Sequence, residues 1–141
     1  MFSANARTFL FGLSLVVLLA GFASSNPRKP QRLASGTWGG MHIRLNVEAR
    51  AATVEYDCAS GTIDGPLNLD SKGRFNWRGT FHRERPGPTR ADDPGTDRAA
   101  TYSGSVKGDR MTLTVRLTDT GDVLQTYALK RGGFGRVVKC K

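Results

Sequence analysis

The chain has 141 residues, with 21 lysines and arginines against 12 aspartates and glutamates, so its formal net charge is +9 at pH 7. This length suits one folded domain and is too short for two. The positive charge favours anionic partners, such as acidic glycans, lipid headgroups or an acidic protein. Nucleic acid is not an expected partner, because the basic residues are scattered and match no nucleic-acid-binding motif.

Residues 1–23 have the order of a secretory signal peptide. Arg7 supplies the positive charge, an apolar run follows, and small residues close it at Gly21 and Ala23. A membrane-spanning helix needs about 20 apolar residues, whereas this run is shorter and is interrupted by glycine and serine. We therefore expect cleavage after Ala23, with Ser25 as the second choice. The mature protein would be periplasmic or extracellular and would not span the membrane.

Residues 24–35 are expected to form a disordered leader. They contain two prolines, three basic residues and one leucine, which is too little apolar surface for stable packing. The folded domain is then expected over residues 36–141. Loss of Arg7 with the signal peptide would leave a charge of about +8 on the mature protein.

From residue 36 onward, apolar and polar residues alternate with a period of two, which predicts strands with one buried face. The buried side is expected to include Met41, Trp77, Tyr102 and Tyr127. Eight strands are expected, the first opened by residues 36–38, at about 41–47, 54–58, 63–69, 74–82, 100–106, 111–117, 123–130 and 136–140.

One long connection interrupts the strands. Residues 84–98 hold three prolines, two glycines and seven charged residues, which predicts an exposed loop. No segment after residue 35 shows a helical period. Eight short strands joined mainly by tight sequential turns predict an all-β fold, an antiparallel eight-stranded up-and-down (meander) barrel.

The two cysteines, Cys58 and Cys140, are expected to form a disulfide. An even number of cysteines in an exported chain is typical of disulfide pairing. The chain has no C-x-x-C motif, which disfavours a redox-active or metal-binding thiol pair. A meander barrel returns its last strand to its first ones, so the bond and the closed topology support each other.

Two short motifs resemble known barrel families. Gly36-Thr-Trp38, together with Trp77-x-Gly79-x-Phe81, resembles the calycins, the lipocalins and avidins, in which such a Trp closes one end of an eight-stranded barrel. That resemblance implies a carrier of a small apolar ligand, although the chain has no biotin-site or lipocalin loop signature.

Tyr56-Asp-Cys58 with Cys140 resembles the periplasmic inhibitors of c-type lysozyme, which implies a lysozyme or hydrolase inhibitor. The S-G-x-x-Y loop of those inhibitors has no counterpart, because Ser103-Gly104 lies within a predicted strand.

A longer resemblance is to a group of small exported bacterial proteins, from which no activity carries over. It covers most of residues 36–140. The matching pieces are Trp38-Gly-Gly-Met-His-Ile43, Tyr56-Asp-Cys-Ala-Ser-Gly-Thr-Ile-Asp64, Gly73-x-Phe75 followed by Gly79-Thr80, Glu84-Arg-Pro-Gly-Pro88, and Tyr102-x-Gly-x-Val-x-Gly-x-x-Met-Thr-Leu-Thr-Val115.

The sequence carries no signature of catalysis. An enzyme should show a nucleophile with a base, paired carboxylates or metal ligands. The chain has two histidines, His42 and His82, and both fall on the outward side of predicted strands. Asp92, Asp93 and Asp97 lack the spacing of a calcium loop. We expect no catalytic residue, no metal and no cofactor, and a protein that acts by binding.

Two binding hypotheses remain. In the first, loop 84–98 recognises an envelope protein or an anionic glycan, because long loops in compact domains are often functional; its candidate residues are Arg83, Glu84, Arg85 and Arg90. In the second, the barrel interior holds a small apolar ligand. The candidate pocket residues are Trp38, Tyr56, Trp77, Phe81, Tyr102 and Tyr127. The number of large inward residues favours a filled interior, and therefore the loop.

Overall fold

The computed structural model describes residues 29–85, 87 and 97–140 of the chain. Within that part the backbone forms strands and no helix. The strands are β1 (Gln31–Arg32), β2 (Gly36–Gly40), β3 (Ile43–Val47), β4 (Ala51–Tyr56), β5 (Ala59–Asp64), β6 (Asn68–Leu69), β7 (Arg74–Arg83), β8 (Asp97–Lys107), β9 (Arg110–Leu117) and β10 (Val123–Arg131).

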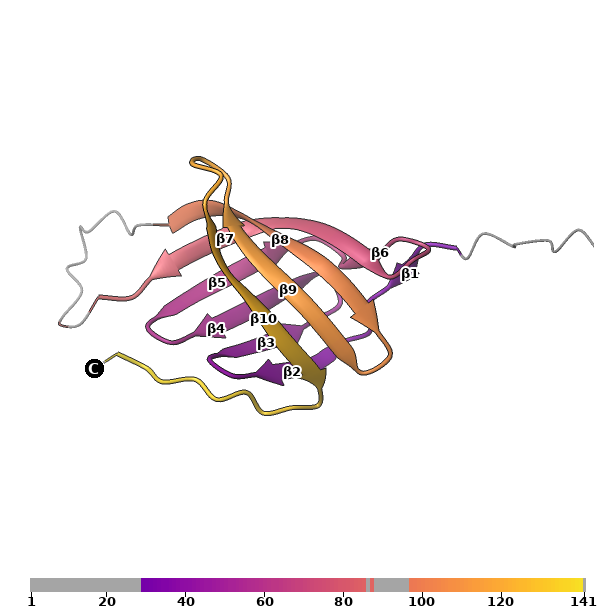
Figure 1. The fold of residues 1–141 in the computed structure, drawn as a ribbon, viewed down its shortest axis with the longest axis horizontal. Helices are drawn as coiled ribbons and strands as arrows, with labels where there is room; N and C mark the ends of the chain where they lie inside the picture. The colour runs from indigo at the N-terminus through magenta and orange to yellow at the C-terminus, as the bar shows by residue number, and fades with distance from the viewer. Residues whose placement is uncertain (1–28, 86, 88–96, 141) are drawn as a thin grey trace, which may run out of the picture.

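Eight of these strands close into one barrel, in the order β10-β2-β3-β4-β5-β7-β8-β9 (Figure 1). All neighbouring strands are antiparallel, and barrel strands that follow one another in the chain lie side by side. The predicted antiparallel eight-stranded up-and-down barrel is therefore confirmed. The remaining strands, β1 and β6, pair with each other in a separate two-stranded sheet.

The barrel has two ends that carry different segments. Because neighbouring strands alternate in direction, β2, β4, β7 and β9 all end on one side, where the disulfide also lies; we call this side the disulfide end. Strands β3, β5, β8 and β10 end on the other side, next to the small sheet of β1 and β6; we call this side the β1–β6 end. Figure 1 shows β1 and β6 at one end of the barrel and the C-terminal segment reaching toward the other.

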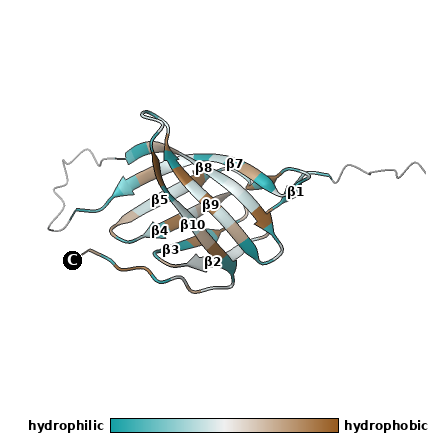
Figure 2. Ribbon diagram, viewed as in Figure 1, coloured by the Kyte–Doolittle hydropathy of each residue, from teal (hydrophilic) through white to brown (hydrophobic). Residues whose placement is uncertain are grey.

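The alternating sequence packs the barrel interior. Along β9, Met111, Leu113, Val115 and Leu117 are buried while the residues between them are exposed or half-buried, and Figure 2 shows this alternation of hydropathy along the strands. Inward side chains from all eight barrel strands join one hydrophobic cluster. Each large apolar side chain buried in this way stabilises the fold by roughly 1.5–3 kcal/mol. The middle of the barrel is therefore a packed core.

The predicted first strand is two strands in the structure. Strand β2 ends at Gly40 and β3 begins at Ile43, with a tight turn between them. His42 in that turn has a φ of 64°, a left-handed conformation that a residue other than glycine adopts only in special places. Met41 was expected on the buried side, but it lies in the turn and is 60% exposed.

The predicted last strand, at residues 136–140, is wrong. The eighth barrel strand is β10, which pairs with β2 through three residue pairs, from Leu129 opposite Gly40 to Arg131 opposite Trp38. Residues 136–140 form no strand and make a single parallel bridge between Arg136 and Met41. The barrel still has the predicted eight strands. The first predicted strand is divided into β2 and β3, and this makes up for the missing last strand.

Several other boundaries differ from the prediction, among them the start of β4 at Ala51 and of β5 at Ala59. The third predicted strand continued to Leu69, but β5 ends at Asp64, and Leu69 belongs to β6 outside the barrel. The leader expected over residues 24–35 is structured in its last part. There Gln31 and Arg32 form β1, and Leu33 is buried with its amide bonded to the carbonyl of Leu67 at 2.8 Å. The expected signal peptide and cleavage site lie outside the described residues.

After β10 the chain crosses the outside of the barrel as a strap, residues 132–140. The strap lies close to β2, because Gly39 has no side chain: a Cβ at Gly39 would collide with the backbone of Gly133 and Gly135. The Arg44 guanidinium donates a hydrogen bond to the Phe134 carbonyl at 2.7 Å. The strap therefore reinforces the short seam where β10 closes the barrel on β2.

In the described part of the chain there is no helix with the length and apolar content needed to cross a bilayer.

Candidate functional site

The disulfide end of the barrel is hollowed by two adjoining cavities, which we together call the mouth. Their volumes are about 340 Å³ and about 280 Å³, and Phe81, Arg83 and Leu124 line both. The other lining residues come from the ends of β4, β5, β7, β8, β9 and β10 and from the residues next to them. In the larger cavity they are Tyr56, Asp57, Cys58, Ala59, Glu84, Gln125 and Tyr127. In the smaller cavity they are Arg85, Arg98 and Leu117.

An aromatic cluster forms the floor of the mouth. The ring of Tyr56 lies 5.6 Å, centroid to centroid, from the rings of both Phe81 and Tyr127. Tyr56 is 3% exposed, whereas Phe81 and Tyr127 are half-buried and pack against the core from the open side. Phe81 and Tyr127 therefore contribute apolar surface that the core leaves partly uncovered.

The Tyr56 hydroxyl is a buried polar group without a hydrogen-bond partner among the described residues. Burial raises the pKa of this hydroxyl well above its ordinary value, with the neighbouring Tyr102 adding to the shift. Burial, followed by the charge of Asp57, also raises the pKa of Tyr127. Both phenols therefore stay protonated at neutral pH and can donate a hydrogen bond.

Arginines form the rim of the mouth. Arg83 and Arg85 are exposed, and neither forms an ion pair with any residue in the described ranges. Arg98 is held by Asp119, whose two carboxylate oxygens each accept a hydrogen bond from Nη2 at 2.8 Å. The Arg98 guanidinium lowers the pKa of that carboxyl. Two positive charges that pair with no described residue therefore stand beside the aromatic floor.

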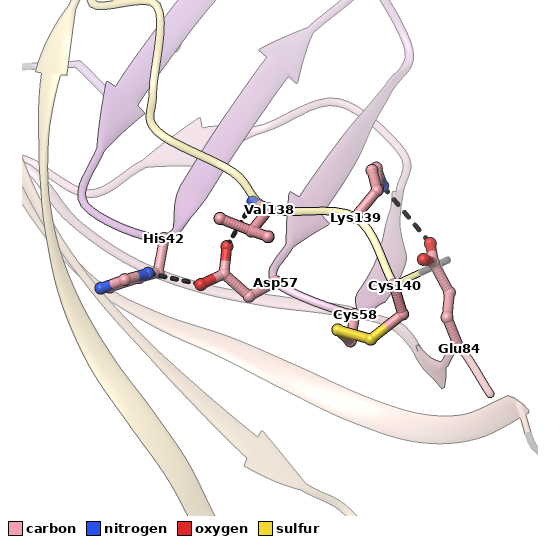
Figure 3. The surroundings of a disulfide bond; sticks show 7 residues. All are labelled: His42, Asp57, Cys58, Glu84, Val138, Lys139 and Cys140. Atoms are coloured by element: carbon pink, nitrogen blue, oxygen red, sulfur yellow. Dashed lines mark hydrogen bonds and ion pairs between the residues drawn. A yellow bond between two sulfur atoms is a disulfide. The ribbon is translucent and has the colours of Figure 1, made fainter. Parts of the chain in front are cut away.

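The disulfide fixes the strap against the edge of the mouth (Figure 3). Cys58 and Cys140 are joined, with 4.9 Å between their Cα atoms, which confirms the predicted pairing. Beside them, the Asp57 carboxylate accepts a hydrogen bond from the Val138 amide at 2.7 Å and another from His42. A disulfide is typical of proteins in oxidising compartments outside the cytoplasm.

A second contact ties the strap to the start of the long connection. Lys139 Nζ lies 3.3 Å from a carboxylate oxygen of Glu84, and the Glu84 amide bonds to the Cys58 carbonyl at 2.9 Å. Figure 3 shows this pair and the Asp57 cluster on either side of the disulfide. Glu84, a candidate loop residue, is therefore engaged with the strap.

The structure brings together part of each predicted site. Tyr56, Phe81 and Tyr127 from the pocket hypothesis lie in the mouth together with Arg83 and Arg85 from the loop hypothesis. The fourth loop candidate, Arg90, and most of the predicted loop lie outside the described residues.

The other three pocket candidates do not line the mouth. Trp77 stacks on Phe75 with 3.8 Å between ring centroids, and its Nε1 donates to the Asn68 carbonyl at 3.0 Å. Tyr102 is fully buried, and its hydroxyl donates to the Thr80 carbonyl at 2.6 Å. Trp38 lies at the β1–β6 end.

Both histidines lie beside a carboxylate, which the strand pattern alone did not predict. His42 contacts Asp57, and His82 Nδ1 lies 2.7 Å from Asp97. The side chains are not buried: His42 is 53% exposed and His82 is 35% exposed. Across the described ranges, no group of three or more histidine, cysteine, aspartate or glutamate side chains has a geometry that could hold a metal ion.

The mouth residues that sequence reasoning missed include Leu124 and Arg98. Arg98 was assigned to the loop, but β8 begins at Asp97, so its register opposite Phe81 brings it to the mouth. Leu124 falls on a register shift between Val123 and Gln125, and a simple alternation cannot place a residue at such an irregularity. No protein-family model, curated protein or solved structure matches this chain.

Proposed function

We propose that this protein is an exported, non-catalytic binding module that takes an anionic amphiphile at the mouth of its barrel. The observation that supports this most directly is the juxtaposition of the aromatic cluster of Tyr56, Phe81 and Tyr127 with Arg83 and Arg85, which form no ion pair with a described residue. The aromatic floor would cover the apolar part of the ligand. The arginines would bind its anionic group, because guanidinium groups bind oxyanions through paired, charge-assisted hydrogen bonds.

The size and chemistry of the mouth fit this ligand class. Cavities of about 300–1,000 Å³ with apolar walls and a few placed polar groups are typical of small-molecule sites. The partner-free hydroxyl of Tyr56 is one such group, since buried polar groups nearly always have a hydrogen-bond partner. A ligand oxygen reaching the floor would provide one.

This proposal joins the two hypotheses drawn from the sequence. The long connection leaves the barrel after Arg83 and rejoins it at Asp97, next to Arg98. Arg83 and Arg98 both line the mouth. A ligand held there would therefore contact the base of the loop and the end of the interior at once. Export rests on the signal-peptide pattern of residues 1–23, and the disulfide is consistent with it.

The test compares two fluorescent probes that share an aromatic body. Anilinonaphthalene sulfonate carries an anionic group, and phenylnaphthylamine does not. Phe81→Ala should weaken the binding of both probes by about tenfold, because it removes apolar floor. The Arg83→Gln/Arg85→Gln double variant should weaken only the sulfonate probe, again by about tenfold, and that binding should fall as salt is added.

The matched control is Arg78→Gln, which removes an exposed charge from the same strand as Arg83, at a position that does not line the mouth. It should leave the affinity for both probes unchanged, and thermal melts should show every variant folded. Equal weakening by Arg78→Gln and by the rim variants would mean that the sulfonate responds to overall charge, and the proposal would fail. Failure of Phe81→Ala to alter either affinity would place the probes elsewhere.

A further inference from the structure

A second cavity, which we call the basic cavity, lies at the β1–β6 end, across the barrel from the mouth. Its volume is about 420 Å³. Its walls come from β1 and the residues beside it, the β6–β7 and β8–β9 turns, the end of β10 and Trp38 of β2. Five of its lining residues are basic: Lys29, Arg32, Lys72, Lys107 and Arg131.

These positive charges are not compensated within the described part of the chain. None of the five forms an ion pair with a described residue. Asp70 is the one acidic residue among the described lining residues, and its carboxylate is already engaged. It accepts hydrogen bonds from the backbone amides of Lys72 and Arg74 at 2.9 and 2.8 Å and from Arg74 Nε at 2.9 Å. The cavity is therefore strongly cationic.

A buried hydrogen-bond donor without a partner borders the same cavity. Trp38 is 1% exposed, and its Nε1 has no acceptor among the residues that the structure describes. The other tryptophan, Trp77, has its Nε1 bonded to the Asn68 carbonyl. Because buried donors are nearly always bonded, an acceptor oxygen that entered the cavity and reached the Trp38 indole would complete its hydrogen bonding.

Backbone hydrogen bonds fix the segments that carry Lys72 and Arg131 before any ligand arrives. The turn that carries Lys72 is closed by Asp70 and by the bond from the Gly73 amide to the Asp70 carbonyl at 3.0 Å. Arg131 stands opposite Trp38 in the β10–β2 register, and its amide bonds to the Asp109 carbonyl at 2.8 Å. Such preorganisation reduces the entropy lost on binding.

We infer that the basic cavity binds a phosphate ester, with an oxygen accepting the Trp38 Nε1 hydrogen bond and the charge held by Lys72, Lys107 and Arg131. A phosphate monoester carries close to two negative charges at neutral pH, so it matches a dense cluster of cations better than one carboxylate does. Arginine and lysine are the usual phosphate-binding side chains. The volume leaves room for an organic group attached to the phosphate.

The test uses the two indole N–H signals of the full chain in nitrogen–proton correlation spectra. The probes are inorganic phosphate, inositol hexakisphosphate and phosphatidylcholine vesicles that contain phosphatidic acid. Titration should move the Trp38 signal downfield, because a new hydrogen bond forms there. The Trp77 signal should stay nearly fixed, because its partner is already the Asn68 carbonyl. Trp77→Phe assigns the two signals.

Charge variants establish where the probe binds. Lys72→Gln and Lys107→Gln should each weaken binding of inositol hexakisphosphate by about tenfold. The control Arg78→Gln removes a charge outside the cavity and should alter the affinity less than twofold. A response to inositol hexakisphosphate supports a soluble phosphate ester, and a response confined to the vesicles assigns the phosphate to a lipid headgroup.

Three results would overturn the inference. The first is a Trp38 signal that moves with none of the phosphate probes. The second is equal loss of affinity in Arg78→Gln and Lys72→Gln, which would indicate general attraction to a basic protein. The third is binding of citrate as tight as that of the phosphate esters, since citrate offers carboxylates only. The mouth takes no part in these measurements, so failure here leaves the proposed function standing.

Discussion

The Asp57 carboxylate accepts a hydrogen bond from the Val138 amide at 2.7 Å, although the two residues are 81 positions apart. The contact joins the β4–β5 turn to the strap. The disulfide lies close by, because Cys58 follows Asp57 directly and Cys140 lies two residues after Val138. The disulfide and the Asp57–Val138 hydrogen bond therefore attach the end of the strap to the same turn. Nearby, β10 and β2 close the barrel through only three residue pairs.

Reduction of the disulfide should strongly lower the stability of the barrel. The bond joins residues 82 positions apart, and in the chain-entropy model closing such a loop contributes about 4 kcal/mol. Reductant, or Cys58→Ser with Cys140→Ser, should lower the melting temperature by about 10 °C or more. Calorimetry with and without reductant measures this, and coincident melting curves would contradict it.

Acid should loosen the strap through Asp57. Its pKa is lowered, first by the hydrogen bond from the Val138 amide and then by His42. A carboxyl whose pKa is lower in the folded state adds stability above its unfolded pKa of about 3.9, and this stability is lost as the pH falls through the lower, folded value. The protection factor of the Val138 amide, which is the intrinsic exchange rate divided by the observed rate, should therefore fall below about pH 4.

Asp57→Asn should remove most of that acid response, whereas Asp64→Asn, at an exposed carboxylate, should leave it unchanged. The comparison needs melting temperatures and Val138 exchange rates for all three proteins across the acid range. Parallel pH profiles for the wild type and Asp57→Asn would show that Asp57 has no such role.

A methyl group at Gly61 should destabilise the core through Tyr102. The added Cβ would collide with the Tyr102 hydroxyl and approach the Thr80 carbonyl at 2.6 Å, where that hydroxyl donates its hydrogen bond. We expect Gly61→Ala to cost roughly 1–3 kcal/mol, and Tyr102→Phe to cost about 1 kcal/mol. Denaturant unfolding measures both.

The double variant Gly61→Ala/Tyr102→Phe should be more stable than the sum of the two single losses implies, because removing the hydroxyl relieves part of the clash. This defines a double-mutant cycle with a coupling of at least about 0.5 kcal/mol. Strict additivity would mean that the strain at Gly61 comes from the backbone of β7 alone.

Gly39→Ala should displace the strap, since the new Cβ would collide with the backbone of Gly133 and Gly135. The loss should appear as faster amide exchange at Arg136 and Val138, which bond to Gly40 and Asp57 respectively. In a Cys58→Ser background, Gly39→Ala should lower the free energy of unfolding by less, because the strap is then free to move away from β2. An equal cost in both backgrounds would place the strain within the β2–β10 seam.

The fold was predictable because a barrel imposes one rule on every strand. Each inward position must be apolar, so the alternation of Met111, Leu113 and Val115 specifies both a strand and its buried face. The β2–β3 turn was not predictable, because His42 at a φ of 64° gives no compositional signal. Residues 136–140 were mistaken for a strand because they carry two β-branched valines, although outside the single bridge at Arg136 their backbone hydrogen bonds go to turn residues and to the Asp57 side chain.

The inward residues of the site were predictable, but how far each lies along the barrel axis was not. The alternation of apolar and polar residues along each strand placed Tyr56, Trp77 and Tyr127 on the inward side. The structure confirms this, because all three pack in or against the core. Depth along the barrel axis depends on register, however, and register comes from pairings between strands distant in the sequence. Tyr56 and Tyr127 therefore share the mouth, while Trp77 lies with Phe75 away from it.

The seam between β2 and β10 can form only late in the synthesis of the protein. β2 is the first barrel strand to be synthesised, yet the residues that cover its outer edge, Leu129 to Arg131, are among the last of the described chain. Until they emerge, β2 presents an open strand edge of the kind that pairs with other chains. The nascent protein is thus most vulnerable to aggregation before β10 is complete, and a chaperone that shields the edge of β2 would protect it during that interval.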